Sequence, residues 1–86
     1  MKPGRVVRCE VTAHEPWGLV VRLLPPEPPV RGTVDIALVS EKRPFDPAVD
    51  YPEIGSEITA VVIAHEPDEE LRLNAWASAV ESARYS

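Results

Sequence analysis

The sequence has 86 residues, enough for one small domain, and a chain of this size buries only about 60% of its unfolded surface. Hydrophobic residues make up 44% of it and are mostly aliphatic, which indicates a globular chain and excludes a disordered one. The formal net charge of −5 argues against a general affinity for phosphate backbones, because that affinity comes from Lys and Arg displacing counterions. Acidic proteins still bind nucleic acid where their positive charges are segregated.

One cysteine, Cys9, excludes an internal disulfide, and its place in an alternating run predicts a small buried hydrophobic residue. No apolar run approaches the roughly 20 residues that span a bilayer, so no membrane partner is expected. Met1 is followed by Lys-Pro-Gly, which is not the basic and then apolar pattern of a leader. A reduced, cytoplasmic compartment is the expected setting.

Apolar residues at every second position predict the first two strands. The first covers residues 5–13 and ends before Pro16, because proline cannot donate to a sheet ladder. The second begins at Gly18, which allows a bend or bulge. The inward sets are Val7, Cys9, Val11 and Ala13 on the first strand and Leu19, Val21 and Leu23 on the second, with Val20, Arg22 and Leu24 outward.

A proline-rich bridge, LPPEPP at residues 24–29, separates the second strand from the third. Its prolines exclude a tight two-residue hairpin turn and favour an extended, stiff polyproline conformation. Two interpretations stay open, a rigid connector and a ligand for a proline-recognising groove. A third strand is predicted at about residues 30–38, with Val34 and Ile36 inward and Thr33, Asp35 and Ala37 outward.

Residues 40–55 have no strand pattern, and their prolines and aspartates suit turns and one short helical turn at about 46–51. Phe45 and Tyr51 are expected to plug one end of the core. A fourth strand at 57–65 is apolar on both faces, which predicts cover on both sides.

A turn at 67–69 leads into a fifth strand at 70–74 with Leu71 and Leu73 inward. Residues 76–84 are alanine-rich, with Trp76, Val80 and Ala83 at helical spacing, and predict a short terminal helix.

Short strands with a long connection between the third and the fourth predict an all-β fold, a five-stranded antiparallel barrel. The oligonucleotide/oligosaccharide-binding (OB) barrel has this layout, and its binding surface is the face of strands two and three. We therefore expect residues 1–86 to form a single OB-fold domain, with the barrel at about 4–74 and the terminal helix at about 75–84.

Five segments have an order and spacing that point to a known family. They are GRVVRCEV (4–11), WGLVV (17–21), RGTVDI (31–36), IGSEITAVVIA (54–64) and LRLN (71–74). The chain resembles the S1-type RNA-binding domain, an OB barrel, from about residue 4 to residue 74. The resemblance implies this fold and the binding of single-stranded RNA. Members of the family hold RNA with two exposed aromatics around strand two, a histidine on strand three, and an acidic-basic pair at the turn between strands four and five.

This sequence keeps some of those positions and replaces others. Trp17 matches the first aromatic, while Val20 stands at the second and removes one stacking platform. Asp35 stands where the histidine would be. At the turn Glu66 matches the acidic position and Glu70 replaces the basic one. The resemblance therefore supports the fold more fully than the activity.

Positive side chains around this face are candidates for phosphate contacts. Arg22 and Arg72 lie outward but are opposed by Asp35 and Glu70, so the local charge is near zero. Arg31, Lys42 and Arg43 are expected on loops, as a small positive rim. Trp17 has two interpretations, a base-stacking platform and a partly buried cover over the barrel mouth. The predicted nucleic-acid-binding residues are Trp17, Val20, Arg22, Arg31, Lys42, Arg43 and Arg72.

His14 and His65 recur in the tetrapeptide Ala-His-Glu-Pro at 13–16 and 64–67, which raises a metal hypothesis. Strands one and four run antiparallel in this fold, so the two histidines belong to opposite ends of the barrel and no shared metal is predicted. No serine, cysteine or lysine has a base partner at motif spacing, and the acidic residues at 66–70 are typical of a solvated turn. Neither catalysis nor a cofactor is expected.

Two functions remain open from the sequence. The first is a weak or non-sequence-specific module for single-stranded RNA. The second is an S1-like barrel that has lost its RNA affinity and acts on a protein partner, as an interaction or inhibitor domain. The net charge, the replaced residues, the proline bridge and the terminal helix favour the second, whereas the family resemblance favours the first.

Overall fold

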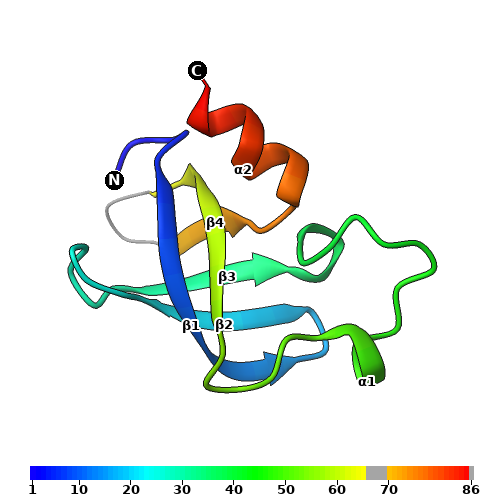
Figure 1. The fold of residues 1–86 in the computed structure, drawn as a ribbon. Coiled ribbons are helices and arrows are strands. Elements are labelled where there is room, and N and C mark those ends of the chain that lie inside the picture. Colours follow the sequence, from blue (N-terminus) through cyan, green and yellow to red (C-terminus); the bar gives the residue numbers. More distant parts are fainter. Residues whose placement is uncertain (66–69, 86) are drawn as a thin grey trace.

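A computed structural model describes residues 1–65 and 70–85 and shows a closed barrel with the strand order β1-β2-β3-β5-β4 (Figure 1). All neighbouring strands are antiparallel except β3 and β5, which are parallel. The predicted five-stranded OB-type barrel with a terminal helix is thereby confirmed. Its strands are β1 (Val6–Glu15), β2 (Gly18–Leu23), β3 (Arg31–Asp35), β4 (Glu57–Ala64) and β5 (Leu71–Asn74), and its helices are the 3₁₀ helix η1 (Ile36–Leu38), α1 (Pro47–Asp50) and α2 (Ala77–Arg84). The predicted turn at 67–69 lies outside the described residues.

Alternating aliphatic side chains fill the barrel, as the sequence predicts. Leu19, Val21 and Leu23 of β2 and Leu71 and Leu73 of β5 are buried in one hydrophobic cluster. Cys9 is also buried there, and this burial raises the pKa of its thiol to about 12. The prediction of a small hydrophobic cysteine is confirmed. No helix among the described residues is long and apolar enough to cross a membrane.

The first strand departs from strict alternation. A register shift between Val11 and Ala13 pairs Ala13 with Val20, a residue of the outward row of β2. The prediction that Ala13 points inward with Val11 is therefore wrong. A bulge of this kind adds one residue to one strand and moves the residues after it to the other face.

The third strand is shorter than the predicted 30–38, because η1 replaces its last residues. The Asp35 side chain accepts a hydrogen bond from the N–H of Ala37 at 2.9 Å and thereby caps η1. The proline bridge also differs from the prediction. It is not extended, since the N–H of Glu27 bonds the carbonyl of Leu24 at 3.1 Å and closes a turn.

The connection at 40–55 contains α1, which confirms the predicted helical turn. Its cap is Asp46, whose side chain accepts from the N–H of Ala48 at 3.0 Å. Phe45 and Tyr51 are half-buried and pack against the core cluster, as predicted.

The terminal helix α2 packs mainly against β4 and β1 and leaves the β2–β3 ribbon uncovered (Figure 1). Its first turn is capped from a distant loop, where a Glu41 carboxylate oxygen accepts from the N–H of Ser78 at 2.8 Å. Hydrogen bonds from the backbone and then the side chain of Ser78 hold the pKa of Glu41 below its ordinary value. Trp76 joins the same region, since its indole N–H donates to the carbonyl of Ala37 at 2.9 Å.

The start of β2 lies very close to the end of β3. Gly18 has a φ of +153°, and a Cβ built there would lie 2.0 Å from the carbonyl oxygen of Val34 and 2.9 Å from the nitrogen of Ile36. Backbone atoms cannot move aside as a flexible side chain would. Glycine is therefore required at position 18.

We expect Gly18→Ala to lower the free energy of unfolding by about 3 kcal/mol or more, because backbone strain and overpacking act together. The measurement is urea denaturation followed by tryptophan fluorescence. Gly4→Ala is the matched control, since Gly4 also has a positive φ, +90°, but nothing lies within 4 Å of its added Cβ. Equal destabilisation of the two variants would contradict the close approach.

We expect Glu41→Gln to destabilise the protein at neutral pH, because a carboxylate binds a helix N-terminus better than an amide does. A carboxyl whose folded-state pKa is lowered stabilises the fold above its ordinary value of 4.5 and loses this effect as the pH falls through the lower folded-state value. The difference between parent and variant, measured by urea denaturation, should therefore vanish in acid. Glu81→Gln, on the exposed surface of α2, is the control, and a difference that persists in acid would contradict the charge effect.

Candidate nucleic-acid interface

The outward side chains of β2, β3 and β5 form two rows across the barrel. In one row Val20 lies opposite Thr33, and Thr33 lies opposite Arg72. In the other row Arg22 lies opposite Arg31. Both rows lie on the face predicted to bind, which α2 does not cover.

Trp17 lies beyond these rows along the strand direction, immediately before β2 begins. Its side chain is 45% exposed, and no hydrogen bond or ring contact joins the indole to the described residues. Its carbonyl accepts from the N–H of Ile36 at 2.8 Å, so the backbone is fixed at the end of β3. A half-exposed aromatic on a fixed backbone can stack against a flat ligand.

Val20 lies outside the core cluster, in the outward row, but its side chain is only 7% exposed. The sequence predicts Val20 as an outward contact residue. The structure places it in the outward row but shows that it is covered. Little of its surface remains for a ligand. The second aromatic position of this face therefore offers neither an aromatic ring nor an open surface.

Two arginines of the face already form ion pairs with carboxylates. Arg22 bonds Glu10 at 2.7 Å, and Arg31 forms an ion pair with Glu70. Arg31 is the first residue of β3, so its predicted place on a loop is wrong. Arg72 is exposed and has no ion-pair partner among the described residues. Glu66, predicted at the acidic position of the turn, lies outside those residues.

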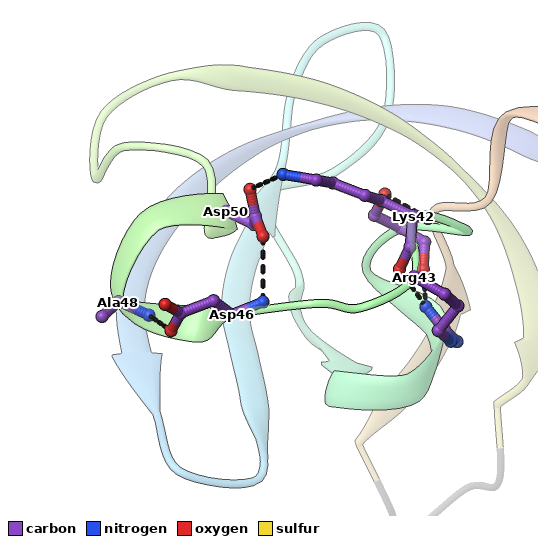
Figure 2. A network of polar contacts seen from close by, with 6 residues as sticks. Lys42, Arg43, Asp46, Ala48 and Asp50 are labelled. Carbon is purple, nitrogen blue, oxygen red and sulfur yellow. Dashed lines mark hydrogen bonds and ion pairs between the residues drawn. The ribbon is translucent and has the colours of Figure 1, made fainter.

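Lys42 and Arg43 lie on a loop, as predicted, and Figure 2 shows how each is held. Lys42 bonds a carboxylate oxygen of Asp50 at 2.6 Å, and this bond holds the pKa of Asp50 below its ordinary value. Arg43 donates to the carbonyls of Ser40, Lys42 and Ala37 at 2.8, 2.7 and 3.3 Å. Its guanidinium also lies 6.0 Å from the centre of the Trp76 ring.

An aromatic row lies at the same end of the barrel as Trp17. The ring centres of His14 and Tyr51 are 5.0 Å apart, and those of Phe45 and Tyr51 are 5.8 Å apart. The Tyr51 hydroxyl donates to the carbonyl of Glu15 at 2.9 Å, which ties the row to the end of β1. Burial, and next the charge of Asp35, raise the pKa of Tyr51. The sequence predicts Phe45 and Tyr51 as core plugs and gives no sign of this grouping.

The two histidines do not come together. His14 bonds the carbonyl of Pro52 at 2.6 Å, whereas the ring of His65 bonds the amino group of Met1 at 2.8 Å. No three His, Cys, Asp or Glu side chains among residues 1–65 and 70–85 are grouped as metal ligands would be.

Comparison with known families gives one match over most of the chain. The family model of the S1 RNA binding domain matches residues 1–75. No curated protein matches the chain at a significant level.

Several solved structures share the fold. The a/eIF2alpha–aDim2p–rRNA complex from Pyrococcus horikoshii OT3 has a chain that is 19% identical with a TM-score of 0.78, covering 99% of this chain and 51% of that one. The intact alpha subunit of aIF2 from Pyrococcus abyssi is 20% identical with a TM-score of 0.76, covering 90% and 29%. GSP13 from Bacillus subtilis is 24% identical with a TM-score of 0.70, covering 87% and 55%. The present chain thus spans about half, or less, of these structures.

We expect Trp17→Ala to lower the free energy of unfolding by about 1–2 kcal/mol, below the ~3–5 kcal/mol typical of a buried aromatic, because the side chain is half exposed. Urea denaturation measures this. Leu19→Ala, at a fully buried position, is the comparison and should cost about 2–5 kcal/mol. A loss in Trp17→Ala that matches or exceeds the loss in Leu19→Ala would identify Trp17 as a core cover.

Proposed function

The chain belongs to the S1 RNA-binding domain family, and on this premise we propose that it binds single-stranded RNA weakly and without base preference. The proposed surface is Trp17 together with the outward rows of β2, β3 and β5. The proposed role is binding without catalysis. The observation that carries the proposal is the half-exposed Trp17 on the same face as rows that hold Arg22, Arg31 and Arg72.

Stacking on Trp17 supports binding of unpaired bases. A base on an aromatic side chain contributes about 1–3 kcal/mol, and every base has a flat face, so such contacts are tolerant of sequence. In a duplex the base faces are covered by their neighbours. A single strand is therefore the form of RNA that this surface suits.

Phosphate binding at the rows requires exchange of partners. The ion pairs of Arg22 and Arg31 are solvent-exposed, and such pairs contribute about 0–1 kcal/mol, so a phosphate can replace either carboxylate. Arg72 has no ion pair with any of the described residues, so a phosphate would not have to replace a carboxylate there. Together these arginines offer about three phosphate contacts, with Lys42 and Arg43 farther out on the rim.

Binding of a protein partner is the second candidate. The observation in its favour is that Glu10, Glu70 and Asp50 pair with Arg22, Arg31 and Lys42, which reduces the positive charge offered to RNA. Loss of RNA affinity with retention of the fold would produce such a surface.

Titration with a short single-stranded RNA separates the two functions. We expect movement of the Trp17 indole signal in NMR spectra and a slope of log K against log salt of about −2, since each of about three phosphate contacts contributes about −0.7. Trp17→Ala should weaken binding about 5- to 150-fold, the range of one stacked base.

Arg72→Gln should make the salt slope shallower by about 0.7. Arg84→Gln is the matched control, because Arg84 is an exposed arginine at the end of α2, away from the rows. No spectral change at millimolar RNA in low salt would reject RNA binding and favour a protein partner.

A further inference from the structure

A small pocket of about 320 Å³ lies beyond the end of β3, lined by Ile36, Ala37, Arg43 and Phe45. Ile36 connects it to the platform, since its N–H bonds the carbonyl of Trp17 at 2.8 Å. The volume is near the lower end for ligand pockets, about 300–1,000 Å³, which suits one nucleobase.

The lining suits a flat, weakly polar group. Ile36, Ala37 and Phe45 provide apolar surface, and the Phe45 ring packs against Tyr51, with 5.8 Å between the ring centres. Arg43 already donates hydrogen bonds to the carbonyls of Ser40, Lys42 and Ala37. These bonds hold the guanidinium as a fixed plane, and RNA-binding proteins stack bases on such planes.

The charge around the pocket argues for a base and against a phosphate. Loop residues 41–50 carry three carboxylates and two cations, which leaves one net negative charge. Lys42 is neutralised by Asp50. The neighbouring carboxylates reduce the attraction of Arg43 for a phosphate, whereas they do not affect the packing of a neutral aromatic ring.

The loop that forms the pocket is fixed by its own contacts. Asp50 accepts from the Lys42 ammonium at 2.6 Å and from the N–H of Asp46 at 2.9 Å. The Asp46 side chain in turn caps α1 by accepting from the N–H of Ala48 (Figure 2). On the other side of the loop, Glu41 bonds the first turn of α2. The pocket therefore exists before a ligand arrives.

We propose that this pocket is a second base site, in which the nucleobase next to the one on Trp17 packs against Phe45 and the plane of Arg43. It replaces the second aromatic platform, which is missing at Val20. The inference rests on the proposed RNA-binding function and assigns to Arg43 a contact with a base instead of a phosphate.

The test is NMR titration of the full chain with a short single-stranded RNA, combined with affinities of variants. We expect the amide signals of Ile36 and Ala37 and the ring signals of Phe45 to move together with the Trp17 indole. Phe45→Leu removes the aromatic face while keeping an apolar side chain, and Arg43→Lys keeps the charge while removing the plane. Each should weaken binding about 5-fold or more, the lower limit of a stacked base.

Val49→Ala is the matched control, because Val49 is an exposed apolar residue of α1, in the same connection, and does not line the pocket. Its affinity should equal that of the parent. If Phe45→Leu fails to fold, Arg43→Lys and the titration of the parent decide the question.

Two results would overturn the second base site and leave the proposed function intact. One is movement of the Trp17 indole without movement of Ile36, Ala37 or Phe45. The other is parental affinity in Arg43→Lys with weaker binding in Arg43→Gln, which would make Arg43 a simple charge contact. Absence of any change at millimolar RNA would reject both the second base site and the proposed function.

Discussion

The approach of the β2 backbone to the end of β3 at Gly18 determines how the candidate interface is built. Because Gly18 has no Cβ, the carbonyl of Val34 lies where a side chain would start, and the N–H of Ile36 reaches the carbonyl of Trp17. This contact fixes the backbone of the exposed tryptophan. It also places Ile36, the first residue of η1 and part of the pocket lining, next to the Trp17 backbone.

Alternation of apolar residues predicts most of the barrel, because the inward side chains of β1, β2 and β5 all pack into one hydrophobic core. The features that the sequence does not reveal depend on contacts between distant residues or on local turns. In the proline bridge, a hydrogen bond from the N–H of Glu27 to the carbonyl of Leu24 closes a turn, although the composition favours an extended polyproline conformation. The helix α2 is capped by Glu41, 37 positions before the Ser78 N–H that it accepts from. Neither contact leaves a periodic trace in the sequence.

The candidate site is predictable to the extent that it lies on regular strands. Arg22 and Arg72 are outward, as their parity indicates. Trp17 shares the parity of the inward Leu19, yet it is exposed because it lies before β2 begins. Parity also does not reveal that Val20 is covered or that Arg22 has a partner on β1. The pocket escapes prediction because it combines η1 with two loop residues, Arg43 and Phe45, whereas the sequence predicts a strand through residues 36–38. Phe45 is correctly placed against the core, yet a half-buried ring also presents surface outward.

The distribution of charge gives the proposed interface a direction. Asp35 lies opposite Gly18, at the end of β3. Arg31 begins the same strand, about 13 Å away at the usual rise of a strand. Apolar and aromatic surface with a carboxylate nearby favours bases at the first end, and arginines favour phosphates at the second. A single strand lying along β3 would thus meet a base-binding end and a phosphate-binding end in turn. On the proposed function, this separation would reconcile RNA binding with a net charge of −5.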